Sequence, residues 1–211
     1  MKQDDINKVY KEIPLKKIPW IYETPPAILI ELINSGKIKP CKTIDLGCGT
    51  GNYAIYLARK GFNVTGIDIS PAAIKIAKRN ADEKKVKCNF LVADFLAELN
   101  ELKHNYDFAY DWEVLHHIFP EKRGKYIKNV YNLLNTEGIY LTVSFSDRDP
   151  CFGGQRKYRK TPLGTVLYFS SENELKKLFS PFFNIEILKT IEIRGKPISH
   201  LANYALMKRK N

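Results

Sequence analysis

Apolar and polar positions follow two alternating periods through the central part of the chain. Between residues 42 and 146, short runs rich in β-branched and aromatic residues alternate with segments that have helical spacing. This alternation is typical of βα units, whose strands stack into a parallel sheet because each helix crosses back over that sheet. The predicted strands cover residues 43–46, 63–68, 87–93, 107–112 and 139–145.

Two proline-containing sequences predict where helices begin. Ser70-Pro71 follows the second strand and supplies an N-cap residue and a proline suited to the first helical position. Thr24-Pro25-Pro26 has the same character and predicts a helix before the first strand, with Pro25 as its first residue. Residues 120–134 form a longer helical segment, and residues 135–138 are expected to turn into the fifth strand.

The last third of the chain has a different pattern. Residues 146–165 are rich in Gly, Pro, Arg and Lys without any period, so we expect a long loop there, which in a compact domain is usually functional or mobile. Ser170-Ser171 predicts a capped helix, and the alternating runs at 183–193 and 199–207 predict a hairpin. We expect a single domain over residues 1–211, with residues 1–23 and 146–165 as candidate lids.

A glycine-rich sequence directly follows the first predicted strand. Residues 44–51 read Ile-Asp-Leu-Gly-Cys-Gly-Thr-Gly, and a helical segment begins after them. Glycines at such a turn let the backbone approach a ligand without obstruction by side chains. The spacing is G-x-G-x-G, and Asn52 stands where a dinucleotide-binding loop has its last glycine. The loop alone also fits an ordinary tight turn from strand to helix.

Acidic residues stand at the ends of the next two predicted strands. Asp68 ends the second strand, where a carboxylate can accept hydrogen bonds from both hydroxyls of a ribose. Asp94 ends the third strand and is followed by Phe95, a pair that could accept from an adenine amine and cover the base. Each acid alone could instead cap a helix. Together with Asp45 they predict a nucleoside-containing cofactor at this edge of the sheet.

With these residues the sequence resembles the class I S-adenosylmethionine-dependent methyltransferases over about residues 25–207. The resemblance implies an α/β, Rossmann-like fold: a seven-stranded, mostly parallel sheet in the order 3-2-1-4-5-7-6, with the seventh strand antiparallel and helices on both faces. It implies S-adenosyl-L-methionine as cofactor and S-adenosyl-L-homocysteine as its product. The cofactor residues that it implies are Asp45, Gly47, Cys48, Gly49, Gly51, Asp68, Ile69, Asp94, Phe95, Asp111 and Trp112.

The sequence after the fourth predicted strand contains candidate proton acceptors. Residues 113–117 read Glu-Val-Leu-His-His, and the Val-Leu-His-His run resembles quinone-biosynthesis methyltransferases. Methyl transfer from a sulfonium needs alignment and exclusion of water, and it needs a base only if the acceptor keeps its proton near neutral pH. We interpret His117 and, in second place, His116 as catalytic candidates, although each histidine also fits a structural role. Glu113 and Asp111 are further possible bases.

Two irregular segments contain candidate acceptor-binding residues. Ile18-Pro19-Trp20 and Pro25-Pro26 resemble the entry segment of thiopurine, thiol and halide methyltransferases, in which that segment folds over the cofactor. Aromatic faces could wall an acceptor pocket, and the basic residues of 156–160 could attract an anionic acceptor. The candidate substrate residues are Trp20, Tyr22, Phe152 and Arg156.

Composition narrows the possible partners. The formal charge of the 211 residues is +11, but the basic residues are mostly lysines scattered among acids, which favours a solvated surface over nucleic-acid binding. No apolar run approaches the ~20 residues of a membrane span, and the N-terminus lacks the apolar core of a signal peptide. The four cysteines form no C-x-x-C pair, so we expect no metal site.

These observations predict a cytoplasmic methyltransferase, monomeric or homodimeric and without membrane contact, that acts on a small-molecule acceptor. A methyltransferase for RNA or protein and a non-catalytic S-adenosylmethionine-binding protein are the alternatives.

Overall fold

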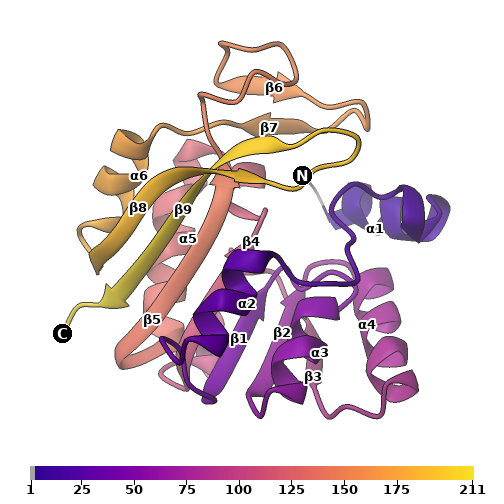
Figure 1. Ribbon diagram of the computed structural model, residues 1–211, viewed down its shortest axis with the longest axis vertical. Coiled ribbons are helices and arrows are strands. Elements are labelled where there is room, and N and C mark those ends of the chain that lie inside the picture. Colours follow the sequence, from indigo (N-terminus) through magenta and orange to yellow (C-terminus); the bar gives the residue numbers. More distant parts are fainter. Residues whose placement is uncertain (1–2) are drawn as a thin grey trace.

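A seven-stranded sheet forms the centre of the molecule, in a computed structural model that describes residues 3–211 (Figure 1). Its strand order is β3-β2-β1-β4-β5-β9-β8, and β9 runs antiparallel to both of its neighbours. The five strands from β1 to β5 are parallel to one another, which confirms the predicted topology with β9 as its seventh strand. The strands are β1 (Lys42–Leu46), β2 (Asn63–Asp68), β3 (Asn89–Val92), β4 (Tyr106–Trp112), β5 (Leu134–Phe145), β8 (Phe183–Ile193) and β9 (His200–Arg209).

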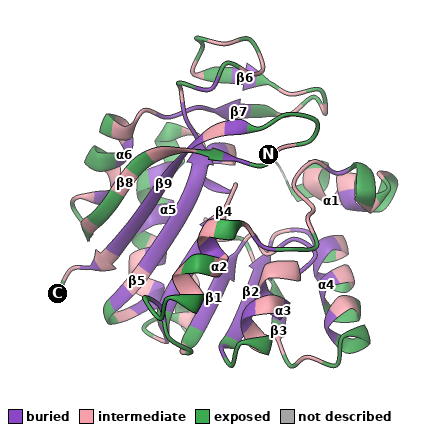
Figure 2. Ribbon diagram, in the orientation of Figure 1, coloured by how far each residue is buried: buried purple, intermediate pink, exposed green. Residues whose placement is uncertain are grey.

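Helices cover both faces of the sheet, and each face buries its own apolar core. Side chains of α2, α3 and α4 pack on one face, and side chains of α5 and α6 pack on the other. In α4 the buried residues Ile74, Ala77 and Ala81 recur every three or four positions, so one stripe of the helix faces the sheet. Figure 2 shows buried strands between helices whose outer surfaces are exposed. These helices are α2 (Ala27–Asn34), α3 (Asn52–Arg59), α4 (Pro71–Glu83), α5 (Pro120–Leu133) and α6 (Glu172–Phe179).

The capping residues confirm two predicted helix starts and correct a third. Ser70 Oγ accepts a hydrogen bond from Ala73 N at 3.2 Å at the start of α4, and Ser171 with Glu174 forms a capping box on α6. The start predicted at Pro25 is wrong, because α2 begins at Ala27. Pro25 precedes another proline, and the ring of a following proline disfavours helical backbone.

Two strand boundaries also differ from the predicted ones. The turn predicted over residues 135–138 is wrong, because β5 begins at Leu134 directly after α5. Tyr106 of β4 pairs with Leu134, but Phe108 pairs with Ile139. The residues of β5 between these two pairs outnumber those of β4, so they form a bulge in β5. β3 begins at Asn89, two residues later than predicted.

Part of the predicted loop at 146–165 is ordered as a strand. β6 (Tyr158–Lys160) pairs with β7 (Val166–Tyr168) in a small separate hairpin. Arg159 is only 2% exposed and lies over the Phe169 ring, with its guanidinium carbon 3.9 Å from the ring centre. It donates to backbone carbonyls of the same loop, Asp147 O at 2.9 Å and Cys151 O at 3.0 Å. This arginine therefore holds the loop together and is not free to attract an anion.

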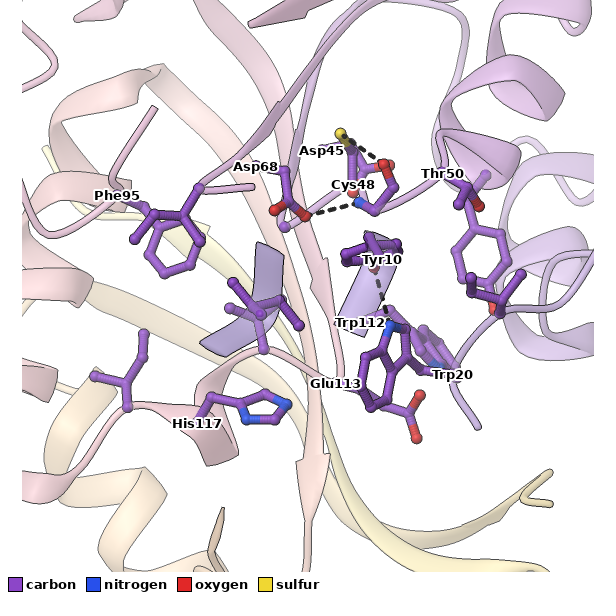
Figure 3. Close-up of a pocket in the computed structure, with 18 of the residues that line it drawn as sticks. Tyr10, Trp20, Asp45, Cys48, Thr50, Asp68, Phe95, Trp112, Glu113 and His117 are labelled. Carbon is purple, nitrogen blue, oxygen red and sulfur yellow. Dashed lines mark hydrogen bonds between the residues drawn. The ribbon is translucent and has the colours of Figure 1, made fainter. Parts of the chain in front are cut away.

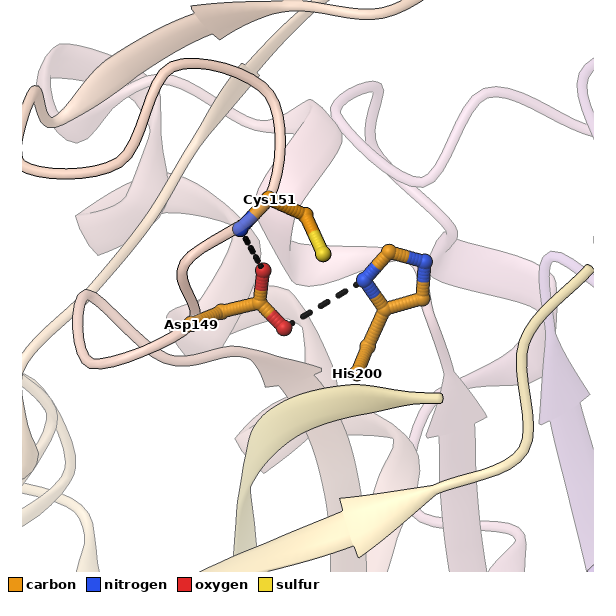
Figure 4. A group of neighbouring side chains, drawn as sticks. All are labelled: Asp149, Cys151 and His200. Carbon is orange, nitrogen blue, oxygen red and sulfur yellow. Dashed lines mark hydrogen bonds and ion pairs between the residues drawn. The ribbon is translucent and has the colours of Figure 1, made fainter. Parts of the chain in front are cut away.

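A buried carboxylate fastens the base of this loop to the start of β9 (Figure 4). Asp149 accepts hydrogen bonds from Cys151 N at 2.7 Å and from Leu201 N at 2.6 Å, and its Oδ2 lies 3.3 Å from His200 Nδ1. The His200 ring also contacts the ring of Phe152 at 5.3 Å. The cluster explains why a loop of irregular sequence keeps a defined position.

The N-terminal segment packs on the sheet domain and contains two helices that the sequence analysis did not predict. It contains α1 (Gln3–Glu12) and the short 3₁₀ helix η1 (Leu15–Lys17). Asn7 Oδ1 accepts from Ser70 Oγ and from Ala72 N, both at 3.0 Å, so α1 is attached to the first turn of α4. Tyr10 and Ile18 form a third small core with Ala73. Among residues 3–211, no helix is both long enough and apolar enough to cross a membrane.

Asp111, predicted to contact the cofactor, lies on the opposite face of the sheet from the residues before and after it. It is fully buried and accepts hydrogen bonds from Tyr126 Oη and Thr142 Oγ1, both at 3.0 Å, and from Tyr140 Oη. Side chains alternate along a strand, so if Trp112 faces one side, Asp111 must face the other. Asp111 is therefore part of a buried polar network beneath α5.

Glycine at position 51 is required by packing as well as by backbone conformation. Gly51 and Gly36 both have left-handed backbone, with φ of +76° and +73°, but a Cβ on Gly51 would lie 2.7 Å from Phe90, whereas one on Gly36 would meet nothing within 4 Å. Gly36→Ala should cost about 1 kcal/mol from the left-handed conformation alone. Gly51→Ala should cost about 1–3 kcal/mol more because the core is overpacked. Urea unfolding of both variants checks this, and equal losses would contradict it.

Burial raises the pKa of Asp111 to about 6, against the hydrogen bonds that lower it. A carboxyl whose pKa is raised on folding contributes stability below its unfolded pKa of about 4 and loses it as pH rises through the folded value. Between pH 4 and pH 8 the free energy of unfolding of wild type should therefore fall. The fall should exceed that of Asp111→Asn by on the order of 2 kcal/mol. Urea unfolding across this range measures the difference. Asp82→Asn, on the exposed face of α4, should follow wild type, and parallel curves for wild type and Asp111→Asn would contradict the assignment.

Candidate active site

A cavity of about 410 Å³ lies at the carboxyl ends of β1, β2 and β4 (Figure 3). Open parallel sheets bind ligands at this edge, because the loops that lead into the helices meet there. The volume is within the range of pockets for small molecules and cofactors. Residues of the N-terminal segment, among them Tyr10 and Trp20, close the cavity on the side away from the sheet.

The glycine loop after β1 is held against β2 by its own backbone. Gly47 N and Cys48 N both donate to Ile67 O, at 2.8 and 3.0 Å, and Gly49 N donates to Asp68 Oδ2 at 2.9 Å. Gly47 and Gly49 have left-handed backbone, with φ of +75° and +53°. A Cβ on Gly47 would also lie 2.4 Å from Val114. The loop can follow this path only with glycine at these positions.

Carboxylates from three strand ends face one cavity, as the sequence predicted. Asp45, Asp68 and Asp94 all line it. Asp68 Oδ1 accepts from Ser70 N at 2.8 Å, and Asp94 Oδ1 accepts from Leu96 N at 2.8 Å, so the backbone holds both side chains in place. Burial raises the pKa of Asp45 to about 7 and also raises that of Asp68. Clustered acids in a low-dielectric cleft favour a positively charged ligand.

Most of the predicted cofactor residues line this cavity. They are Asp45, Gly47, Cys48, Gly49, Asp68, Ile69, Asp94, Phe95 and Trp112. Gly51 and Asp111 are not among the lining residues within 3–211. Gly51 packs instead against Phe90 and Ala77.

The two histidines after β4 have different environments. His116 is 2% exposed, stacks on the Phe145 ring at 4.2 Å and accepts a hydrogen bond from Phe145 N at 3.3 Å, so it is part of the core. His117 lines the cavity, and its ring meets the edge of Trp20 at 6.4 Å. Burial lowers the pKa of His117 to about 3, so its imidazole is neutral and weakly basic at physiological pH.

The predicted acceptor residues separate into two groups. Trp20 and Tyr22 line the cavity. Phe152 lies outside it against His200, and Arg156 is exposed on the loop, where its carbonyl accepts from Arg159 Nε at 2.6 Å. The candidate lid at 146–165 therefore does not bring these two residues to the cavity.

Three further lining residues were missed by the sequence analysis or left without a role. Tyr10 lies over the glycine loop, since a Cβ on Gly49 would meet its hydroxyl at 2.8 Å, and it accepts a hydrogen bond from Trp20 Nε1 at 2.9 Å. Tyr53 follows the loop on α3. Asn52 Nδ2 donates to Tyr22 O at 2.9 Å, which attaches the N-terminal segment to α3. The only sequence signal for Tyr53 and Asn52 was their position next to the glycine loop.

Comparisons with known proteins agree with this geometry. The profile of the family described as "Methyltransferase domain" matches residues 44–138. TehB of Haemophilus influenzae, named a probable S-adenosyl-L-methionine-dependent methyltransferase, is 31% identical over 76% of this chain and 52% of its own length. This chain thus spans about half of that protein. An uncharacterized methyltransferase of Schizosaccharomyces pombe is 30% identical over 56% of this chain and 80% of its own length.

The similarity extends to the complete fold. A solved structure, reported for the conversion of a disulfide bond into a thioacetal group during echinomycin biosynthesis, superimposes with a TM-score of 0.84 at 25% identity. The superposition covers 99% of this chain and 92% of that one. The family profile covers the glycine loop and the strand ends that enclose the cavity. This chain therefore belongs to the class I S-adenosylmethionine-dependent methyltransferase family, whose cofactor is S-adenosyl-L-methionine.

Proposed function

We propose that this protein transfers the methyl group of S-adenosylmethionine to a small-molecule acceptor bound beneath the N-terminal segment. One observation carries the proposal: Trp20 and Tyr22 of that segment close the same cavity that the glycine loop and the acids of β1 and β2 open into. An acceptor must therefore reach the donor through a cavity that this segment partly covers. A folded RNA or protein would need this side of the cavity to be open.

The donor half of the cavity fits adenosine and a cationic sulfonium. Asp68 uses part of its acceptor capacity on Gly49 N and Ser70 N, and its remaining lone pairs would receive the ribose hydroxyls. Asp94 would accept from the adenine amine, with Phe95 beside the base. Asp45 and the other acids would complement the positive charge of the donor. When bound, the donor supplies an activated methyl group.

The chain's own contribution to the reaction is alignment and exclusion of water. The methyl group moves by in-line displacement, so holding the acceptor on the correct line removes much of the entropic barrier. Trp20 and Trp112 cover the cavity with aromatic faces, which exclude water and stabilise a neighbouring cation. Neither effect requires a strong acid or base.

The N-terminal segment is held over the cavity by the hairpin between β8 and β9. The Tyr22 ring lies beneath Arg194 and Lys196, at 4.0 and 4.6 Å from its centre. Arg194 also donates to Thr24 O at 3.1 Å, and Lys196 Nζ donates to Ile21 O at 2.7 Å. We call these contacts the Tyr22 clasp. They connect the cover of the acceptor chamber to the far end of the sheet.

The positive net charge does not favour a nucleic-acid acceptor. In the loop at 146–165 Lys157 pairs with Asp147 at 2.8 Å and with Glu174 at 2.6 Å, and Arg159 is buried. Lys157 and Arg159 are therefore bound within the protein and are not available to phosphate groups. The small-molecule proposal therefore has the better support from the described residues.

Asp68→Ala should weaken binding of S-adenosylhomocysteine by about 5- to 150-fold, because a buried ribose would lose its paired acceptor at a cost of about 1–3 kcal/mol. Isothermal titration calorimetry measures this. Asp82→Ala, with an exposed side chain on α4, is the matched control and should bind as wild type does. Equal affinity in Asp68→Ala would remove Asp68 from the site, and no binding by wild type would refute the proposed function.

Replacing both Arg194 and Lys196 by alanine should open the Tyr22 clasp. Amide hydrogen exchange within residues 18–24 should then become faster. Without the cation–ring contacts, local opening of this segment costs less free energy. Methyl transfer, followed as release of S-adenosylhomocysteine with thiols, phenols and amines, should fall more than cofactor affinity does. Lys189→Ala, on the exposed side of β8, serves as the control. Unchanged exchange in the double variant would show that the clasp does not hold the cover.

A further inference from the structure

Glu113 places a carboxyl group in the cavity beside Trp20 of the N-terminal segment, in the half that the proposed function gives to the acceptor. It directly follows the last residue of β4 and has left-handed backbone, with φ of +65°. Its own amide donates to Val143 O at 2.8 Å, which fixes this backbone against β5. A non-glycine residue in this conformation is strained, and Glu113 is the one such residue among 3–211 that lines the cavity. Figure 3 shows its carboxyl group beside Trp20 and Trp112.

This carboxyl group has no hydrogen-bond or ion-pair partner among residues 3–211, although it lies within the cavity lining. The titratable groups that face it are Tyr22 of the N-terminal segment and Tyr53 of α3, with Arg194 of the β8–β9 hairpin beyond them. Arg194 is engaged in the Tyr22 clasp. Burial raises the pKa of Glu113 to about 7. A group that donated a hydrogen bond to this carboxyl would offset its desolvation.

Aromatic rings from separate parts of the chain surround the same space. They belong to Trp20, Tyr22, Tyr53 and Trp112. Flat faces of this kind stack on a planar ring, and their electron-rich surfaces disfavour an anion. His117, on the same side of the cavity, is neutral at physiological pH because burial lowers its pKa to about 3. This half of the cavity therefore matches a planar, uncharged or cationic acceptor, contrary to the anionic acceptor suggested by the basic residues at 156–160.

We propose that the acceptor is a planar ring compound whose nucleophilic N–H or O–H donates a hydrogen bond to Glu113, and that Glu113 takes up this proton. The inference rests on the proposed methyl transfer and names the chemistry of its acceptor. The carbon–sulfur bond of the donor breaks, and its electron pair stays on sulfur. The new bond to carbon uses the lone pair of the acceptor nitrogen or oxygen. The released proton goes to the Glu113 carboxylate and then to water.

Matched ring probes test the hydrogen bond, because phenol and anisole differ only in whether the oxygen carries hydrogen or methyl. Both tryptophans of the chain, Trp20 and Trp112, line the cavity, so their fluorescence reports binding to the complex with S-adenosylhomocysteine. Above about pH 8, where Glu113 is ionised, wild type should bind phenol about tenfold more tightly than anisole, as expected for a hydrogen bond to a charged acceptor, and should bind benzoate most weakly.

Variants of Glu113 assign the preference to this side chain. Glu113→Leu should bring phenol and anisole to nearly equal affinity, and Glu113→Gln should strengthen benzoate binding because the negative charge is gone. Glu101→Gln, exposed and distant on the short helix at 100–102, should behave as wild type. A phenol preference that survives in Glu113→Leu, or benzoate bound as tightly as phenol by wild type, would overturn the inference.

Turnover gives a second readout that a purely structural role would not change. Methyl transfer to phenols or anilines by wild type should rise with pH through about 7 as Glu113 loses its proton. Glu113→Gln should lack this rise and lower kcat by about 100-fold with little change in KM, since the amide still accepts a hydrogen bond but not a proton. Normal binding of S-adenosylhomocysteine without these effects refutes only the role of Glu113. Failure to bind S-adenosylhomocysteine refutes the proposed function itself.

Discussion

The sharp turn from β1 into α3 is the constraint on which the rest of the structure depends. Two successive amides, those of Gly47 and Cys48, bond to the carbonyl of Ile67 in β2, and the next glycine bonds to the Asp68 carboxylate. The same acid therefore holds the loop and faces the cavity. Because the loop passes close to Val114 and to the Tyr10 hydroxyl, no side chain fits at Gly47 or Gly49.

The two halves of the cavity are built in different ways, and this difference matches their different tasks. The half proposed for the donor lies on strand ends, whose positions the ladder of the sheet fixes, so its carboxylates are held in place before a ligand binds. The acceptor half combines the end of β4 with a covering segment that is attached through Asn7 to α4 and through Tyr22 to the β8–β9 hairpin. Loops and covering segments vary more than strand ends among proteins of one fold, which is how one donor serves many acceptors.

Polar residues near the cavity differ in whether their side chains face the cavity or the core. Asp111 and His116 are residue types found in active sites, yet both lie in the core. Asp111 accepts hydrogen bonds from tyrosine and threonine hydroxyls, and His116 stacks on Phe145. Glu113 and His117, one or two positions away, face the cavity. A buried polar group must find partners inside the fold, whereas one in the cavity can obtain them from a ligand.

The sequence by itself determined the parallel sheet, its order through the family resemblance, and the acids that line the cavity at the strand ends. These follow from local signals: apolar periodicity, a glycine loop, and the acids Asp45, Asp68 and Asp94 at the ends of three strands. The three acids meet at one edge of the sheet because parallel strands share a direction. Only the tertiary structure decided which side chains of 111–117 face the cavity, and that Tyr10 and Tyr53 complete it. Those outcomes depend on contacts between segments far apart in the chain, such as Tyr22 with Arg194, which no local pattern encodes.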